Sequence, residues 1–184
     1  MFLERFRFLL CPFTIAITNQ KNMSRLDIIR KKIVSKPELG KLIHVWQLLS
    51  QKIVFTNGCF DIIHAGHIHT LTSAADFGNK LIVALNTDAS VSKLKPGRPI
   101  QQQDSRALVI AALNCVDAVI LFDEETPLEL IKFIQPDVLV KGGDYSIDQI
   151  IGSQEVLAKG GKVEVIPLLQ GFSTTNIEEK IKKG

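Results

Sequence analysis

The chain lacks any apolar stretch of the roughly 18 residues that a membrane-spanning helix requires, so the sequence predicts none. Its three cysteines, Cys11, Cys59 and Cys115, are odd in number and widely spaced, which argues against a disulfide framework or a zinc knuckle. A reducing, cytoplasmic setting is therefore expected. There is no internal repeat and no low-complexity tract. The 184 residues, 46% of them hydrophobic and 22% charged, suffice for one well-buried domain but not for two ordinary ones.

Excess positive charge is missing from the body of the chain. Residues 1–36 carry eight Lys or Arg against two acidic residues, a net charge of +6. Residues 37–184 carry fourteen against seventeen, a net charge of −3. This balance is not typical of a nucleic-acid-binding domain, so any anion must be bound locally. We expect neither a nucleic acid nor a membrane as partner.

The first 22 residues show little helical or strand regularity. Basic residues precede an apolar run at 8–17, as in a signal peptide, but Glu4 lies beside them, Pro12 interrupts the run and no small-x-small cleavage site follows. We expect a mis-called start or a poorly ordered extension at 1–22, with secretion as the alternative. The expected organisation continues with an N-terminal helical segment at 23–50 and the main domain at 51–184.

Apolar periodicity predicts helices at 26–34 and 37–50, the second with Trp46 as a packing anchor. The apolar face of that second helix comprises Leu39, Leu42, Ile43, Trp46 and Leu49. Beyond residue 51, short β-rich runs alternate with helical stretches. Strands are expected at 52–56, 80–85, 118–122, 137–140 and 162–166. Helices are expected at 65–77, 88–94, 104–114 and 126–134, with a last helix that starts at 175.

Capping patterns set several of these helix starts. Asp104 is the expected N-cap of the helix that begins there. Capping boxes begin at Thr126, with a proline at the first helical position, and at Thr175. The alternation of apolar strands with helices predicts an α/β fold, a Rossmann-like, doubly wound sheet of five parallel strands with helices on both faces. Ligands of such sheets bind outside the carboxyl ends of the strands, at the switch point.

The most informative stretch is TNGCFDIIHAGH at residues 56–67, which leaves the first strand and enters a helix. His64 and His67 lie near the start of that helix, where backbone N–H groups favour anions. Gly66 between them lets a ligand approach the backbone closely. A zinc site is a weaker interpretation, because the HxxH spacing lacks a glutamate base and a clear third ligand. His69 and His44 are interpreted as surface or packing residues.

Residues 58–67 resemble the GxFDxxHxGH signature of the cytidylyltransferase-like nucleotidyltransferases, and GFSTTNI at 171–177 resembles the second signature of that superfamily. The likeness is closest to the adenylyltransferase domain of bacterial ADP-heptose synthesis, which shares LKPGRPI at 94–100 and VKGGDY at 140–145. It runs from about residue 50 to 182. A bifunctional relative carries a sugar kinase domain ahead of this one, so the chain looks like a stand-alone version.

The resemblance implies that a sugar-phosphate oxygen attacks the α-phosphorus of a nucleoside triphosphate and releases pyrophosphate. Catalysis would then rest on in-line positioning and charge neutralisation, with no covalent intermediate. The residues implied as catalytic are His64, His67 and Lys95. The residues implied in nucleotide binding are Asn57, Gly58, Cys59, Phe60, Gly66, Gly142, Gly143, Asp144, Gly171, Ser173, Thr174 and Thr175. The residues implied in acceptor binding are Asp61, Asp88, Lys93, Arg106 and Lys141.

Several of these assignments have plainer alternatives. Lys93 could take the role given to Lys95, and either lysine could be a solvated loop charge. Asp61 and Asp88 could cap helices, and Arg106 could pair with an acid on its own helix. The glycines of residues 140–145 could form an ordinary turn. The implied partners are Mg²⁺ carried with ATP, with no resident metal, and further copies of the chain in a homodimer or higher homo-oligomer.

Cytidylyl-specific relatives carry an arginine shortly before the second signature, where this chain has LLQ at 168–170. This difference favours adenine over cytosine as the base of the nucleotide substrate. The expected reaction makes ADP-heptose from ATP and heptose 1-phosphate, for lipopolysaccharide or surface glycan synthesis. One alternative is a cytidylyltransferase that acts on glycerol 3-phosphate or a related alcohol phosphate. Another is a nucleotide-sensing module without turnover.

Overall fold

The computed structural model describes residues 23–184, except for the side chains of residues 175, 176, 179 and 182 in the last helix. The predictions for residues 1–22 and for the Thr175 side chain lie outside the described part. Among the described residues, no helix combines the length and apolar character needed to cross a bilayer.

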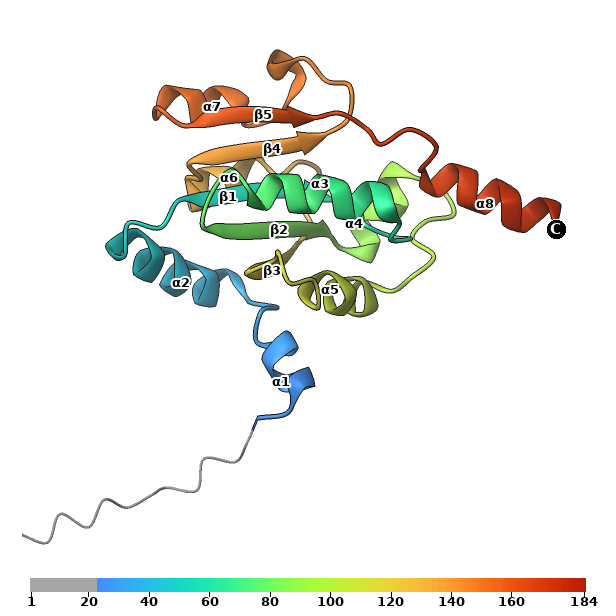
Figure 1. Ribbon diagram of the computed structural model, residues 1–184, viewed down its shortest axis with the longest axis horizontal. Coiled ribbons are helices and arrows are strands. Elements are labelled where there is room, and N and C mark those ends of the chain that lie inside the picture. Colours follow the sequence, from blue (N-terminus) through green and yellow to red (C-terminus); the bar gives the residue numbers. More distant parts are fainter. Residues whose placement is uncertain (1–22) are drawn as a thin grey trace, which may run out of the picture.

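Five parallel strands form one sheet, which confirms the predicted strand number and direction, and their order is β3-β2-β1-β4-β5 (Figure 1). The strands are β1 (Ile53–Gly58), β2 (Lys80–Asn86), β3 (Ala118–Phe122), β4 (Val138–Gly142) and β5 (Lys162–Ile166). The chain winds outward from β1 in one direction and then returns to place β4 on the other side of β1. The switch point therefore lies between the carboxyl ends of β1 and β4, which is where ligands of such sheets bind.

Helices cover both faces of the sheet, and successive residues of each strand serve opposite faces. On one face, α2 (Lys36–Leu48), α6 (Leu128–Ile134) and α7 (Ser153–Ala158) bury apolar side chains together with Ile53 and Phe55 of β1. On the other, α3 (Ala65–Ala75) and α5 (Gln103–Ala111) pack against Val54 and its neighbours. The sheet is thus buried on both sides, as its continuous apolar strands predict.

The remaining elements lie at the margins of this body. The short helix α1 (Arg25–Arg30) precedes α2, and α4 (Asp88–Leu94) follows β2. A 3₁₀ turn, η1 (Ile147–Gln149), lies between β4 and α7. The last helix, α8 (Thr174–Lys183), extends away from the sheet beyond the carboxyl end of β5 (Figure 1).

The N-terminal helical segment is joined to the edge of the sheet. The N–H of Val34 donates to the carbonyl of Val119 at 2.9 Å, and the N–H of Val119 donates to the carbonyl of Lys32 at 2.7 Å. The ammonium of Lys32 also donates to the carbonyl of Val116 at 2.7 Å. Trp46 of α2 lies in the core and is only 8% exposed, which confirms its role as a packing anchor. Residues 23–50 therefore complete the same body as the main domain.

Some local predictions are wrong in detail. The N-cap of α5 is Gln102, so Asp104 lies inside the first turn, and α6 begins after Pro127 without the Thr126 box. Because α2 ends at Leu48, Leu49 is 64% exposed and lies off the apolar face. The sequence patterns also missed η1 and α7, which are too short to show a full apolar period.

Candidate active site

The carboxyl ends of β1 and β4 bring Asn57 and Lys141 together. The Lys141 Nζ donates to the backbone oxygen of Asn57 at 3.4 Å and to its Oδ1 at 3.3 Å. Burial lowers the pKa of the Lys141 ammonium, and the positive charge of Lys95 lowers it further. The switch point therefore holds a half-buried cation, and the loop that carries Lys95 is close enough to influence it.

The two predicted catalytic histidines form one unit at the start of α3. His64 is the N-cap residue of this helix, with an extended backbone (φ −143°, ψ 172°). Its ring stacks on that of His67 with the centroids 3.9 Å apart and the planes 25° from parallel. A Cβ on Gly66 would lie 3.0 Å from Cε1 of His64. Glycine at this position therefore makes room for the imidazole, as well as for a ligand near the helix terminus.

Phe60 supports the histidine pair from the other side. Its ring centroid lies 5.2 Å from that of His67, and a Cβ on Gly58 would meet the Phe60 ring at 2.9 Å. Phe60 is buried and has a φ of 46°, in the left-handed region that bulky residues rarely adopt. Such a conformation persists only where the surrounding structure holds it, and it is enriched at functional sites.

Burial keeps both imidazoles neutral near neutral pH. It lowers the pKa of His67 to about 4, with a further contribution from the adjacent His64 that is partly opposed by the backbone of Ile62, and it also lowers the pKa of His64. Within the described part of the chain, Nδ1 of each ring is buried with no hydrogen-bond partner. The protein thus leaves hydrogen-bonding capacity of both rings unused at a helix N-terminus, where an anion is favoured.

Two glycines at the end of β4 make close contacts, Gly142 with α3 and Gly143 with a side chain of the following loop. A Cβ on Gly142 would meet Cγ2 of Thr70 at 2.8 Å. Gly143 has a φ of 133°, and a Cβ there would meet the ring of Tyr145 at 2.6 Å. Both glycines are therefore required by packing.

The loop after β5 closes the site from a third direction. It borders a cavity of about 440 Å³ lined by Asp144, Pro167, Leu168, Leu169, Gln170, Gly171, Phe172 and Ser173. Cβ of Phe172 lies 3.3 Å from the position of a Cβ on Gly66, so this loop contacts the start of α3. Three predicted nucleotide-binding residues, Asp144, Gly171 and Ser173, thus share one cavity beside the histidine pair. Thr174 is the first residue of α8.

Two predicted acceptor-binding carboxylates hold protein groups. Asp61 is 5% exposed and accepts the backbone N–H groups of Ile100 and Gln101, both at 2.8 Å. These hydrogen bonds and the Arg98 guanidinium outweigh burial and lower the pKa of Asp61. Asp88 accepts the N–H of Gln103, the first residue of α5, at 3.0 Å. Asp88 therefore caps the start of α5, which is the alternative role considered for it from the sequence. Asp61 instead holds the loop ahead of α5.

Arg106 also has a structural environment. Its side chain is fully buried, and it donates to the backbone oxygens of Cys59 at 2.6 Å and Asn86 at 2.8 Å and to Oδ1 of Asp88 at 2.8 Å. Its carboxylate partner therefore comes from α4, not from its own helix as the sequence alternative supposed. The guanidinium ties together the loop after β1, the end of β2 and two helices, and it is not exposed to an incoming phosphate. Cys59 contributes its carbonyl to this network.

Lys93 and Lys95 are both exposed and lie at the end of α4. Lys95 is the C-cap residue of that helix, and its positive charge reaches Lys141. Lys95 as the catalytic lysine stays a prediction from the sequence. Among the His, Cys, Asp and Glu residues that the structure describes, no three converge to hold a metal ion.

Sequence reasoning missed Arg98, although it singled out the stretch 94–100 around it. Arg98 pairs with Asp61 and with Glu178 of α8. The two prolines of PGRP at residues 96–99 indicate a constrained loop around Arg98. A single arginine in a loop, however, does not reveal which carboxylates it pairs with. Thr70 and Tyr145, which pack on the two glycines after β4, were missed for the same reason.

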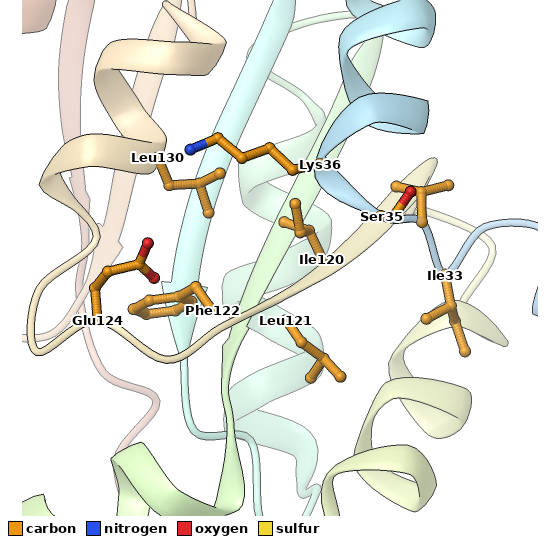
Figure 2. Close-up of a pocket in the computed structure, with 9 residues that line it drawn as sticks. Ile33, Ser35, Lys36, Ile120, Leu121, Phe122, Glu124 and Leu130 are labelled. Carbon is orange, nitrogen blue, oxygen red and sulfur yellow. The ribbon is translucent and has the colours of Figure 1, made fainter.

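A separate cavity of about 360 Å³ lies at the β3 edge of the sheet, and Figure 2 shows Glu124 and Ile33 at opposite ends of it. It is lined by Ile33, Val34, Ser35, Lys36, Ile120, Leu121, Phe122, Glu124 and Leu130. None of these is a predicted site residue. This cavity is therefore distinct from the histidine site.

The sheet order and the parallel strands define an α/β, Rossmann-like fold, with the histidine pair at the start of the helix that follows β1. The chain belongs to the cytidylyltransferase-like family, whose model matches residues 55–180.

Relatives with high identity share this region. The chain is similar to the bifunctional protein HldE of Koribacter versatilis, with 47% identity over 165 residues that cover 89% of this chain and 34% of that protein. It is 52% identical to the HldE protein of Caulobacter vibrioides over 147 residues, covering 79% and 30% of the two chains. The chain thus spans about a third of the length of these curated relatives.

Solved structures agree on the fold. The crystal structure of a lipopolysaccharide core biosynthesis protein from Thermoplasma volcanium is 28% identical, with a TM-score of 0.54, and the match covers 65% of this chain and 97% of that one. A pantoate-beta-alanine ligase from Francisella tularensis matches with a TM-score of 0.55 at 15% identity, over 82% of this chain and 76% of that one. At that identity the second likeness shows the fold alone.

Proposed function

We propose that the protein transfers the adenylyl group of ATP to a heptose 1-phosphate, giving ADP-heptose and pyrophosphate. The observation that carries this proposal is the stacked, neutral pair of His64 and His67 at the N-terminus of α3, beside the loop after β5. High identity to the HldE proteins and the likeness to a lipopolysaccharide core biosynthesis protein support the sugar as acceptor. A role in lipopolysaccharide or surface glycan synthesis follows from the same likeness.

In the proposed reaction, an oxygen of the sugar phosphate attacks the α-phosphorus of ATP. The bond from the α-phosphorus to its bridging oxygen breaks, and pyrophosphate leaves with the electron pair. His67 donates a hydrogen bond to the α-phosphoryl group as negative charge develops there, and His64 holds the triphosphate beside it. Lys95 supplies positive charge from the end of α4. A preorganised donor of this kind contributes about 2.7–4 kcal/mol to transition-state stabilisation.

The nucleotide would lie across the switch point. The backbone of residues 57–60 and Gly66 would face the phosphates, and the hydroxyl groups of Ser173 and Thr174, at the start of α8, would face the β- and γ-phosphates. The adenosine would lie against Gly142, Gly143 and Asp144 and enter the cavity lined by the loop after β5. Mg²⁺ would arrive on the ATP phosphates.

The acceptor phosphate requires a cation close to the α-phosphate. Lys141 is suited to this role because its ammonium lies at the switch point and is held by the oxygens of Asn57. Lys93 would contribute charge from the surface. We assign Asp61, Asp88 and Arg106 to holding these loops in place, because their polar atoms are already bonded to protein groups. A cytoplasmic homodimer or higher homo-oligomer completes the proposal.

Pyrophosphate release tests this function directly. ATP and CTP are each assayed with heptose 1-phosphate and with glycerol 3-phosphate. We expect kcat/KM with ATP and heptose 1-phosphate to exceed that with CTP by at least about 100-fold, since a mismatched base leaves buried polar groups unpaired. A preference for CTP would overturn the adenylyl assignment. ATP binding without pyrophosphate release from any acceptor would instead indicate a nucleotide sensor.

A further inference from the structure

Arg98 joins two carboxylates that come from distant parts of the chain. Its Nη1 lies 2.8 Å from Oδ2 of Asp61, in the loop after β1, and its Nη2 is paired with Oε1 of Glu178, in α8. The side chains are 15%, 5% and 22% exposed, respectively. These are partly desolvated, charge-assisted contacts, which are stronger than ordinary surface ion pairs.

The three segments that meet at Arg98 are those that carry the proposed phosphate ligands. Asp61 lies three residues ahead of His64. Arg98 belongs to the loop that begins at Lys95. Glu178 follows Ser173 and Thr174 by little more than one helical turn. The guanidinium therefore fixes the distances among these segments while it remains outside the phosphate site.

Arg98 is not placed to bind phosphate itself. Both terminal nitrogens of its planar fork already face carboxylates. A triphosphate would have to displace at least one of them and leave that carboxylate unpaired in a partly buried position. The neighbouring backbone N–H groups of Ile100 and Gln101 are likewise bound to Asp61.

The helix that Arg98 anchors extends away from the sheet (Figure 1). Of its two isoleucines, Ile177 is half-buried and Ile181 is 72% exposed, and Phe172 ahead of the helix is 47% exposed. Apolar burial therefore gives α8 less support than it gives the helices on the two sheet faces. An ion pair near the start of such a helix has a large effect on where its first turn lies.

We propose that Arg98 is a positioning residue that locks α8 onto the loop after β1, so that the hydroxyl-bearing first turn is in place before ATP binds. The role rests on the proposed function. Because the lock already orders the first turn of α8, ATP binding does not have to supply the free energy of ordering it. Breaking it lowers the fraction of molecules competent to bind ATP and raises KM, while kcat at saturating ATP changes little.

Glu178→Gln is the sharpest test, because it releases α8 and leaves the Arg98–Asp61 pair intact. We expect KM for ATP to rise about tenfold, the effect of losing one charge-assisted hydrogen bond, with kcat within about twofold. Glu129→Gln is the matched control, since it breaks an exposed ion pair with Lys132 on α6. It should change neither constant.

Hydrogen exchange supplies a readout that does not depend on catalysis. In Glu178→Gln, amides of α8 should exchange faster than in the wild type, and saturating ATP should restore most of the protection. The rest of the chain should be unchanged. Equal α8 protection in the variant and the wild type would overturn the lock, even if the wild type proved inactive and the proposed function failed.

A double-mutant cycle separates the lock from a general loss of stability. Arg98→Gln should raise KM for ATP at least as much as Glu178→Gln, and combining the two should add nothing further. Arg98→Lys should recover part of the loss, because an ammonium reaches one carboxylate without the fork geometry. Additive effects of the two substitutions, or a lower kcat with an unchanged KM, would overturn the proposal.

Discussion

The environment of His67 gives this residue a chemistry that an exposed histidine lacks. Burial against Phe60 and the stacked ring of His64 lower its pKa to about 4. A neutral imidazole keeps one N–H donor and does not need to lose a proton before it acts. In the proposed reaction it therefore acts as a preorganised dipole, which stabilises developing charge without titrating in the physiological range.

Replacing His67 by alanine should reduce kcat of the proposed adenylyl transfer about 10²–10³-fold, because one charge-stabilising donor is lost. The measurement is steady-state pyrophosphate release, with circular dichroism to establish that the variant is folded. His69→Ala, which changes an exposed residue of the same helix, is the control. A folded His67→Ala variant with near-normal kcat would remove His67 from the mechanism.

The same burial makes stability depend on pH. The pKa of His67 falls from the ordinary histidine value of 6.5 in the unfolded chain to about 4 in the native state, so between these values the unfolded chain binds a proton that the native state does not. The free energy of unfolding should therefore decrease as the pH falls from 6.5 towards 4. We expect the free energy of unfolding, measured in urea, to fall more between about pH 7.5 and about pH 5 for the wild type than for His67→Gln. Equal losses would contradict the buried, neutral state.

At the scale of elements, the carboxyl ends of the strands are held together by polar side chains. Arg106 of α5 joins the loop after β1 to the end of β2, and Asp88 joins α4 to α5. Loops at this edge carry no continuous ladder of backbone hydrogen bonds, so side chains satisfy the carbonyl groups there. These contacts hold the elements that flank the site together.

Arg106→Met should destabilise the fold by about 3 kcal/mol, because the carbonyls of Cys59 and Asn86 lose a buried donor. The measurement is the free energy of unfolding from urea titration at neutral pH. Lys132→Met removes a cation from the exposed pair with Glu129 and should cost less than about 1 kcal/mol. Similar losses for the two variants would show that Arg106 does not support the strand ends.

At the scale of the whole molecule, the N-terminal segment and the sheet form one body. Residues 32–34 extend the β3 edge through backbone hydrogen bonds, and α2 covers one sheet face with Leu39, Ile43 and Trp46. The family match begins only at residue 55, yet the core already includes side chains from α2. The sheet needs this helix because its strands are apolar on both faces.

Two truncations should therefore behave differently. Removal of residues 1–22 should leave pyrophosphate release essentially intact, since this segment shares no pattern with the catalytic body. Removal of residues 1–50 should abolish cooperative unfolding, because it exposes the sheet face that α2 covers. Thermal unfolding and turnover of both truncated proteins are the measurements. A large loss of turnover in a folded protein lacking only 1–22 would contradict this expectation.

The sequence alone determined the sheet, its parallel strands and the position of the histidine motif. Strands β2 and β3 are continuous apolar runs between polar turns, a signal that depends only on neighbouring residues. His64, Gly66 and His67 are separated by a few residues, so their convergence on one helix start follows from helix geometry.

Only the tertiary structure decided the roles of Asp61, Asp88, Arg98 and Arg106. A buried carboxylate that secures a loop and one that orients a substrate look the same in sequence, because their partners come from distant segments. The pairing of Asp61, Arg98 and Glu178 depends on how the loop after β1, the loop before α5 and the last helix pack at one edge of the sheet. No local propensity encodes that packing, since it arises from the balance of burial and charge over the whole fold.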